Sequence, residues 1–159
     1  GNIGQCEAII FILDTIKPIV FCHDTTLYLN SNGKVYFDTS AVFSSVLENC
    51  TVDSIWMDKD SANCSQDSVW VTIYALDNSN NIGQCTSIIY IEDTIKPQAI
   101  CRDTTLYIQP NGWAVIDTNR INNSSFDNCN PVNIQITKDS FNCKVLRRIR
   151  FIGTIEWKC

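Results

Sequence analysis

The feature that most constrains the fold is an internal repeat, in which one long stretch of sequence occurs twice. LDTIKPIVFCHDTTLYLNSNG begins at Leu13, and EDTIKPQAICRDTTLYIQPNG begins at Glu92, 79 positions later (92 − 13). Four cysteines recur at the same spacing: Cys6 as Cys85, Cys22 as Cys101, Cys50 as Cys129 and Cys64 as Cys143. Four matches at one period indicate tandem copies of one unit, each the size of a small domain.

The repeat also predicts where the copies begin and end. NIGQC at Asn2 matches NIGQC at Asn81, which precedes the closing strand of a copy. Residues 1–13 are therefore expected to be the last strand of a preceding repeat. Residues 14–92 then form one complete repeat, and 93–159 form a second repeat that lacks its last strand. The short linker DTIKP should leave neighbouring units little slack, because proline restricts the chain.

Alternating apolar and polar residues predict strands in both repeats. VNIQIT (Val132–Thr137) alternates at every position, which is typical of a strand with one buried face. In VWVTIYAL the alternation places four apolar residues on one face: Val69, Val71, Ile73 and Ala75. These patterns predict that the two repeats are built largely from strands.

Turn residues separate the predicted strands. The turns NSNG and QPNG place Gly33 and Gly112 where a positive φ is needed. Ser40–Cys50 is expected to be a loop with one turn, since its counterpart in the second repeat lacks helical spacing. Several short strands in each repeat predict an all-β fold of tandem antiparallel β-sandwiches of immunoglobulin-like type.

Nine cysteines in 159 residues indicate disulfides rather than a metal site. The chain has no C-x-x-C spacing and a single histidine, so a zinc site is not expected. Small domains are often stapled by disulfides, and disulfides imply an oxidising compartment, outside the cell or in the periplasm.

Strand order favours one pairing of the cysteines in the complete repeat. Cys22 begins the first strand and Cys85 begins the last, and in a sandwich with an odd number of strands these starts lie at one pole. Cys50 and Cys64 flank one strand, so Cys50–Cys64 would close a short loop. The chain-entropy model gives about 4 kcal/mol for the longer loop and about 3 kcal/mol for the shorter. The alternative, Cys22–Cys50 with Cys64–Cys85, remains open.

The same scheme predicts Cys101–Cys159 and Cys129–Cys143 in the second repeat, with Cys6 unpaired or paired outside this sequence. The end of the second repeat departs from the pattern, because its apolar face inverts in an ungapped alignment. A shift of one residue returns Ile149 and Phe151 to the apolar face.

Three features together resemble a known family. They are DTIKP before C-x-D-T-T-L-Y, the dipeptide NC at Asn49 and again at Asn63, and the closing strand ALDNSNN that leads to a cysteine. The chain resembles tandem hyalin-repeat (HYR-like) modules, and more narrowly the cysteine-rich form in long cell-surface adhesins of Bacteroidetes, including gliding-motility adhesins. The resemblance spans essentially the whole chain and departs at FIGTIEWKC. It implies an immunoglobulin-like sandwich that serves as a spacer or adhesive unit on the outer surface.

The resemblance also implies O-glycosylation at Asp-Ser/Thr motifs. The candidate hydroxyls, each directly after an aspartate, are Thr15, Thr25, Ser54, Ser61, Ser68, Thr94 and Thr104. The same dipeptide is ordinary turn chemistry at the start of a strand. Both interpretations stay open at this point.

One stretch offers the oxygen ligands that calcium prefers. DNSNN begins at Asp77 and ends at Asn81, and Asp93 in the following linker is expected to join these two residues at a module junction. The alternative is an Asn/Asp turn in a hairpin, with no ion. No other cofactor is predicted.

The sequence gives little support for catalysis or nucleic-acid binding. The single histidine, His23, follows Cys22, which is expected to be bridged and therefore unable to act as a nucleophile. A glycine-rich phosphate loop and a metal-hydrolase motif are both absent from the sequence. The formal net charge of −5 disfavours a polyanionic partner. No apolar run reaches the roughly 18 residues of a membrane span.

The sequence therefore predicts a non-enzymatic repeat region of a secreted adhesin or surface filament, acting as a stiff, disulfide-bonded stalk. Its expected partners are neighbouring copies of the repeat, and surface glycans or other cells. One alternative is a glycan- or calcium-dependent binding module that uses its tryptophans, although two or more of these are expected in the core: Trp56, Trp70, Trp113 and Trp157. Another alternative is a filament subunit in which residues 7–13 complete a neighbouring molecule by strand donation.

Overall fold

The computed structural model of the chain is mostly β and describes residues 1–129, 131–145 and 154–156. Strands account for 41% of the residues and helices for 6%, and the chain forms several antiparallel sheets. The predicted fold class is therefore confirmed as a β-rich chain. Two compact units are present: unit 1 comprises Gly1–Leu27 and Val35–Glu92, and unit 2 comprises Tyr28–Lys34 and Asp93–Cys159.

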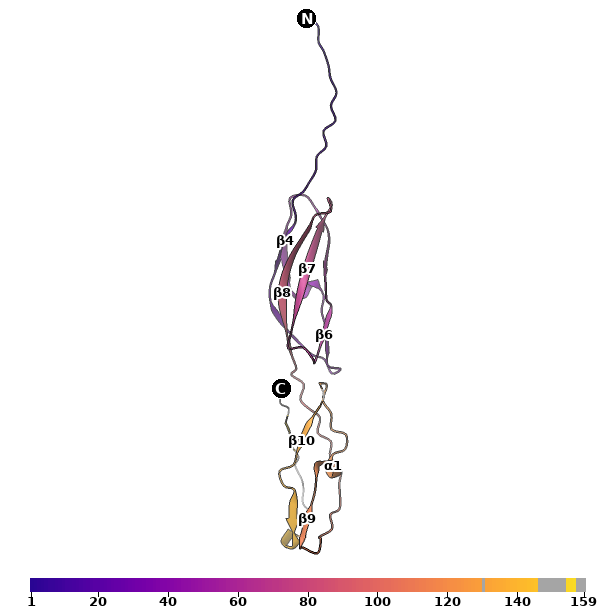
Figure 1. Cartoon of the computed structure of the whole chain (residues 1–159), viewed down its shortest axis with the longest axis vertical. Coiled ribbons are helices and arrows are strands. Elements are labelled where there is room, and N and C mark those ends of the chain that lie inside the picture. The colour runs from indigo at the N-terminus through magenta and orange to yellow at the C-terminus, as the bar shows by residue number, and fades with distance from the viewer. Residues whose placement is uncertain (130, 146–153, 157–159) are drawn as a thin grey trace. The chain divides into compact units, whose positions relative to one another are not determined.

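The first repeat is built from strands of very different length. Its eight strands are β1 (Ile19–Cys22), β2 (Thr25–Tyr28), β3 (Lys34–Tyr36), β4 (Phe43–Leu47), β5 (Val52–Met57), β6 (Ser61–Asn63), β7 (Ser68–Asp77) and β8 (Ile82–Glu92). One sheet has the order β2-β8-β7-β5, and the pairs β1-β4 and β3-β6 form two smaller sheets. β7 and β8 form a long hairpin at the centre of the large sheet (Figure 1).

The core of unit 1 lies against the inward face of this hairpin. Val69, Val71, Ile73 and Ala75 of β7 are at most 4% exposed, so the predicted buried face is confirmed. Buried side chains from the other strands and connections meet them: Val20, Val42, Ala62, Ile89 and Ile91. β-Branched residues suit these positions because they pack well on a pleated surface, and burying each Val or Ile contributes about 1.5–3 kcal/mol.

The prediction of a loop over Ser40–Cys50 was wrong in part. Thr39–Ala41 forms a 3-10 turn, η1, capped by Asp38, whose side chain accepts a hydrogen bond from the Ser40 backbone N–H at 2.9 Å. β4 follows and pairs with β1. Long-range pairing therefore decided the conformation of a segment whose local pattern was ambiguous.

The second repeat has shorter elements in its described residues. They are β9 (Trp113–Val115), α1 (Thr118–Ile121), β10 (Asn133–Gln135), β11 (Ser140–Asn142), the 3-10 turn η2 (Cys143–Val145) and β12 (Thr154–Glu156). β9 pairs with β11, and β10 pairs with β12. A small core forms from Ile116, Ile121 and Phe141, with Leu106 and Ile136 packed against it.

The two repeats use the same pairings at matching positions. β9 and β11 begin at the repeat counterparts of the residues that begin β3 and β6, respectively. The β1–β4 sheet is reduced to two isolated bridges in the second repeat, also at matching positions: Ile19↔Leu47 and Cys22↔Phe43 become Gln98↔Phe126 and Cys101↔Asn122. The predicted turn glycines match as well, since Gly33 and Gly112 have φ values of 67° and 82°.

The register of the second repeat slips by one residue at β12. Ile55 pairs with Ala75 in β5–β7, and Ile134 pairs with Ile155 in β10–β12. Ile134 is the repeat counterpart of Ile55, but Ile155 lies one position beyond the counterpart of Ala75. This slip agrees with the one-residue shift predicted from the inverted apolar pattern, although Ile149 and Phe151 lie outside the described residues.

Candidate functional site

One disulfide joins the first and last strands of the first repeat. Cys22 and Cys85 are bonded, with Cα atoms 6.0 Å apart and a sequence separation of 63. This predicted pair is confirmed, and the alternative with Cys22–Cys50 is excluded. Disulfide bonding is typical of an oxidising environment.

The other predicted bridges are not formed in the structure. Cys50, Cys101 and Cys143 are free and exposed, and Cys6 is free as expected. Cys64 and Cys129 are disulfide-bonded. The predicted pairs that need correction are Cys50–Cys64, Cys129–Cys143 and Cys101–Cys159. Spacing in the sequence does not fix the direction of a side chain, and the Cys50 thiol lies near a group of carboxylates instead.

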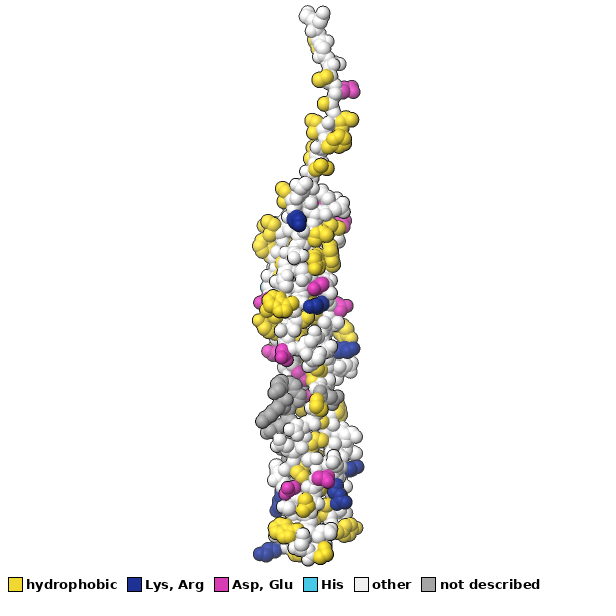
Figure 2. Space-filling model, viewed as in Figure 1, with side chains coloured by type: hydrophobic (Ala, Val, Ile, Leu, Met, Phe, Trp, Pro, Cys, Tyr) yellow, Lys and Arg dark blue, Asp and Glu magenta, His cyan; other side chains and the backbone are white. Residues whose placement is uncertain are grey.

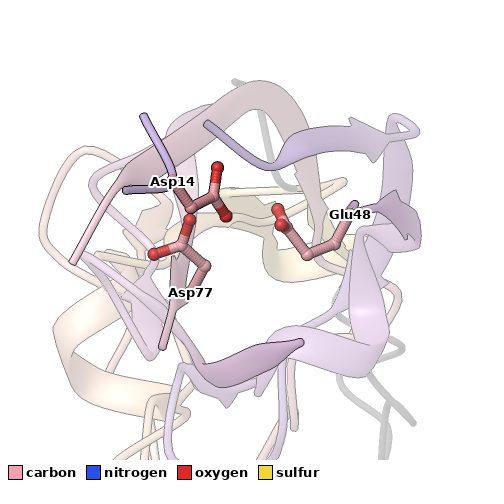
Figure 3. Close-up of side chains that lie close together, drawn as sticks. All are labelled: Asp14, Glu48 and Asp77. Atoms are coloured by element: carbon pink, nitrogen blue, oxygen red, sulfur yellow. The ribbon is translucent and has the colours of Figure 1, made fainter. Parts of the chain in front are cut away.

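These carboxylates belong to Asp14, Glu48 and Asp77 of unit 1. Asp14 lies in the linker, Glu48 directly follows β4, and Asp77 is the last residue of β7. One ligand oxygen from each lies within 4.8 Å of the others, and Figure 3 shows the three side chains turned toward one another. The strand ends and the entering linker therefore gather three acidic side chains at one end of unit 1.

The β7–β8 turn holds Asp77 in place. Its side chain is only 1% exposed. One carboxylate oxygen accepts hydrogen bonds from the backbone N–H groups of Ser79 and Asn81, both at 2.8 Å. The other accepts from the Asn81 side-chain amide, also at 2.8 Å. DNSNN thus forms an ordered Asx turn, and it still leaves the Asp77 carboxylate facing Asp14.

The linker is attached to unit 1 through Asp14. Its carboxylate accepts from the Ile16 backbone N–H at 3.0 Å and from the Asn49 side-chain amide at 3.1 Å. Both bonds hold the pKa of Asp14 below its usual value, and the bond from Ile16 has the larger effect. The Asn81 amide also donates to the Asp14 carbonyl oxygen, at 3.2 Å. The start of the linker is therefore fixed by several hydrogen bonds.

Glu48 contributes an oxygen that the chain does not satisfy. Its Oε1 accepts from the backbone N–H groups of Asn49 and Cys50, at 3.0 and 3.1 Å. Its Oε2 is buried and has no hydrogen-bond partner. Leaving such an acceptor unpaired costs about 1–3 kcal/mol, and more when it is charged. Within the described part of the chain, none of the three carboxylates forms an ion pair with a basic side chain.

The acidic group also affects the neighbouring cysteine. A hydrogen bond with Asp14 raises the pKa of the Cys50 thiol, and desolvation and the charges of Asp14, Glu48 and Asp77 add to the effect. The thiolate, which is the nucleophilic form of cysteine, is therefore disfavoured at Cys50.

The predicted calcium ligands are only partly brought together. Asp77 and Asn81 are in contact, but Asp93 belongs to unit 2, and the linker aspartate beside Asp77 is Asp14. β8 has 11 residues and runs roughly 34 Å away from the β7–β8 turn, so the following linker starts at its far end. Sequence reasoning missed Glu48, although an acidic residue lies two positions before the cysteine of the first NC dipeptide in both repeats.

Unit 2 repeats part of this arrangement. Asp93 accepts from the Ile95 backbone N–H at 3.0 Å and from the Asn128 amide at 3.1 Å, matching Asp14. Asp127, the counterpart of Glu48, is 6% exposed, and its buried Oδ1 has no hydrogen-bond partner. With the one-residue slip, the counterpart of Asp77 is Trp157, which lies outside the described residues.

Comparison of the chain with protein-family models, curated proteins and solved structures gave no match. The HYR-like resemblance therefore stays a prediction. No helix among the described residues has the length and apolar character needed to cross a membrane.

The remaining candidate residues lie at the surface. His23 is at the surface, and its Nδ1 is 3.0 Å from the Ser44 hydroxyl oxygen. Trp56, Trp70 and Trp113 are 39%, 58% and 46% exposed, so the expectation that two or more tryptophans are core residues fails for the described ones. They occupy outward positions on their strands, while aliphatic residues fill the core. Trp157 lies outside the described residues.

An exposed and a half-buried aromatic side chain form a stack on the outer face of the large sheet. Trp56 of β5 and Tyr74 of β7 are cross-strand partners with ring centroids 5.4 Å apart. Stacked pairs of this kind stabilise a sheet face by about 0.5–1.5 kcal/mol beyond area burial.

The predicted glycosylation sites are accessible for the most part. Thr25 is half-buried, and the other six candidate hydroxyls are on exposed residues: Thr15, Ser54, Ser61, Ser68, Thr94 and Thr104. The Ser61 hydroxyl donates to Asp60 at 2.9 Å, as expected for local Asp-Ser turn chemistry. Glycosylation stays a prediction.

Proposed function

We propose that this chain is a structural, non-enzymatic repeat region of an extracellular adhesin or surface filament. Its immunoglobulin-like units, joined by DTIKP linkers, would act as a stiff stalk that carries a binding element away from the cell. The observation that carries this proposal is the same linker attachment in both repeats. Asp14 is bonded to Asn49 and Asp93 to Asn128, each at 3.1 Å.

A linker fixed in this way adds stiffness, because its residues cannot sample alternative conformations freely. In unit 1 the linker proline adds a packing contact. A Cβ built on Gly83 of β8 would overlap the backbone carbonyl of Pro18, so glycine at this position allows the linker to lie directly against the sheet.

The Cys22–Cys85 disulfide supports the same role. It joins the strand that follows the linker to the closing strand, so force applied along the chain meets a covalent bond between the first and last strands. Disulfides persist outside the cell, which supports an extracellular location. The surface position of His23 and the protonated Cys50 thiol favour a scaffold over an enzyme.

Small-angle X-ray scattering tests the stalk proposal. The native chain is expected to give a narrow distribution of maximum dimensions. A variant with a flexible Gly/Ser segment inserted between Glu92 and Asp93 should give a broad one, since it relaxes only the linker. A native distribution as broad as that of the insertion variant would contradict the proposal.

A second candidate function, strand donation, is favoured by one observation. Five consecutive apolar residues of the N-terminal segment, Ile9, Ile10, Phe11, Ile12 and Leu13, are 82–92% exposed, and Figure 2 shows apolar side chains along this segment. Residues 2–6 repeat the start of the closing strand, so this segment matches β8 in sequence. The proposed partner is the open sheet edge of another copy of the unit.

Light scattering with size-exclusion chromatography tests strand donation. The native chain should form larger species as its concentration rises, and Ile10→Asp should prevent them. A monomer at every concentration up to the millimolar range would exclude the filament alternative and leave the stalk proposal intact.

A further inference from the structure

We propose that unit 1 binds one calcium ion between Asp14, Glu48 and Asp77. The oxygens of these carboxylates lie within 4.8 Å of one another. Calcium–oxygen distances of about 2.3–2.6 Å separate ligands on opposite sides of the ion by about 4.6–5.2 Å, whereas the shorter magnesium bonds allow at most about 4.2 Å. All three carboxylates therefore have room to coordinate one calcium ion.

A second observation is independent of the clustering. The Oε2 atom of Glu48 is buried and has no hydrogen-bond partner, and Figure 3 shows this carboxylate directed toward Asp14 and Asp77. The counterpart residue in unit 2, Asp127, is only 6% exposed and also has an unpaired oxygen. Buried polar atoms nearly always have partners. In unit 1 the unpaired oxygen faces two further carboxylates, which indicates a ligand that the chain itself does not supply.

The charges and the types of donor favour a hard divalent cation. The groups that bond to the three carboxylates are backbone N–H groups, the amides of Asn49 and Asn81 and the Cys50 thiol, none of which carries a positive charge. The available ligands are oxygens, which suit calcium better than zinc.

Calcium at this position would connect three segments of the chain. Asp14 lies in the linker, Glu48 after β4 and Asp77 at the end of β7, so the ion would fix the linker to the unit that follows it. The described residues of unit 2 offer two of these acids, Asp93 and Asp127, so the strong site is expected in unit 1. This inference does not depend on the stalk proposal, since a binding module could hold the same ion.

Isothermal titration calorimetry on the full chain, freed of metal, tests the proposal. Native protein should bind one calcium ion with a Kd of about 10⁻⁴–10⁻³ M, the range of extracellular modules, and should bind magnesium at least tenfold more weakly. Glu48→Gln keeps the side-chain size and should weaken calcium binding at least tenfold. Asp67→Asn is the matched control: Asp67 is exposed and directly precedes β7, at the end opposite Asp77, and the substitution removes the same charge. It should bind within twofold of native.

Heteronuclear NMR on the native chain keeps the test independent of whether Glu48→Gln folds. Calcium should shift the backbone amide signals of Ile16, Asn49 and Asn81 while leaving those of β11 unchanged. Absence of heat and of shifts at a calcium concentration about tenfold above 10⁻³ M would overturn the proposal. Equal loss of affinity in Glu48→Gln and Asp67→Asn would also overturn it, because binding would then reflect net charge alone.

Discussion

Unit 1 and unit 2 share their connections but differ in the element that builds the core. In both, the linker aspartate bonds to the asparagine of the NC dipeptide, and the first sheet pairs at the same positions. The core of unit 1 is built on the hairpin of β7 and β8, with 10 and 11 residues. In unit 2, the structure describes Thr154–Glu156 of the strand that pairs with β10.

The difference shows that two kinds of interaction define this repeat. Linkers, turns and caps depend on a few polar residues and form in both units. Asp38 and Asp117, for example, each cap the turn that follows them. The large sheet instead requires two long strands with continuous alternation. Unit 1 is therefore expected to be the more stable unit, and its stability should depend mainly on the hairpin.

Removal of a core side chain from the hairpin should have the largest effect. Ile73 is completely buried, and Ile73→Ala should lower the free energy of unfolding of unit 1 by about 2–5 kcal/mol. The matched variant Ile121→Ala, in the smaller core of unit 2, should cost less, because that core can relax around the cavity. Chemical denaturation measures the loss of stability in each variant, and hydrogen exchange at the amides of β7 and β11 shows whether unit 1 or unit 2 is affected. Equal losses of unfolding free energy would show that the hairpin does not cause the stability difference between the two units.

Loss of the Cys22–Cys85 disulfide should have the next largest effect. Replacing both cysteines by serine should destabilise unit 1 by about 2–4 kcal/mol, because the unfolded chain gains freedom over the long loop that the bridge closes. Thermal unfolding followed by circular dichroism measures the change. Cys6→Ser is the control, since Cys6 is free and exposed, and should leave the melting temperature unchanged. A melting temperature that falls equally in both variants would contradict the structural role of the bridge.

The linker attachment should give smaller effects in both units, with the larger of the two at Asn128, whose amide also donates to the Asn30 carbonyl oxygen at 3.3 Å. Asn49→Ala and Asn128→Ala each remove a side-chain amide that donates to a linker aspartate, and each should cost about 1 kcal/mol. Hydrogen exchange at the Ile16 and Ile95 amides reports the freedom of each linker. An effect confined to one unit would show that the repeated contact has different roles in the two repeats.

Much of the fold could be predicted from short patterns, because those patterns act locally. Gly33 and Gly112 have the positive φ that their turns require, and the buried face of β7 follows from alternation alone. Cys22–Cys85 was predictable because strand order places both residues at one pole. Each of these predictions needed only the repeat and the strand period.

The candidate site was harder to predict, because it depends on which strand ends meet. DNSNN correctly indicated Asp77, but the sequence does not show that its turn lies beside the entering linker, so Asp93 was chosen in place of Asp14. Cys50 was assigned to a bridge from spacing, whereas its thiol lies near Asp14. The direction of a side chain after a strand depends on tertiary pairing, which spacing does not record.

Acidification should give the smallest effect and should distinguish the units once more. Asp24 accepts hydrogen bonds from the Ile88 backbone N–H and the Ser87 hydroxyl of β8, both at 2.8 Å. These bonds lower the pKa of Asp24 below its ordinary value of 3.8, and the bond from Ile88 has the larger effect. A carboxyl whose folded pKa is depressed stabilises the fold above its unfolded pKa, and this contribution is lost as pH falls through the lower folded value. Unit 1 should therefore lose stability below about pH 4.

Asp24→Asn should make the melting temperature of unit 1 less dependent on pH between about 2 and 5, at the cost of a slightly lower value at neutral pH. Asp103→Asn, the same change at the matching position of the second repeat, is the control. Asp103 lies in the part of the repeat that precedes β9, and within the described residues its carboxylate accepts no hydrogen bond, so this variant should leave the pH profile unchanged. If both variants flatten the pH profile equally, the contact between Asp24 and β8 does not cause the pH dependence of the melting temperature. β8 would then contribute to the stability difference between the units through packing alone.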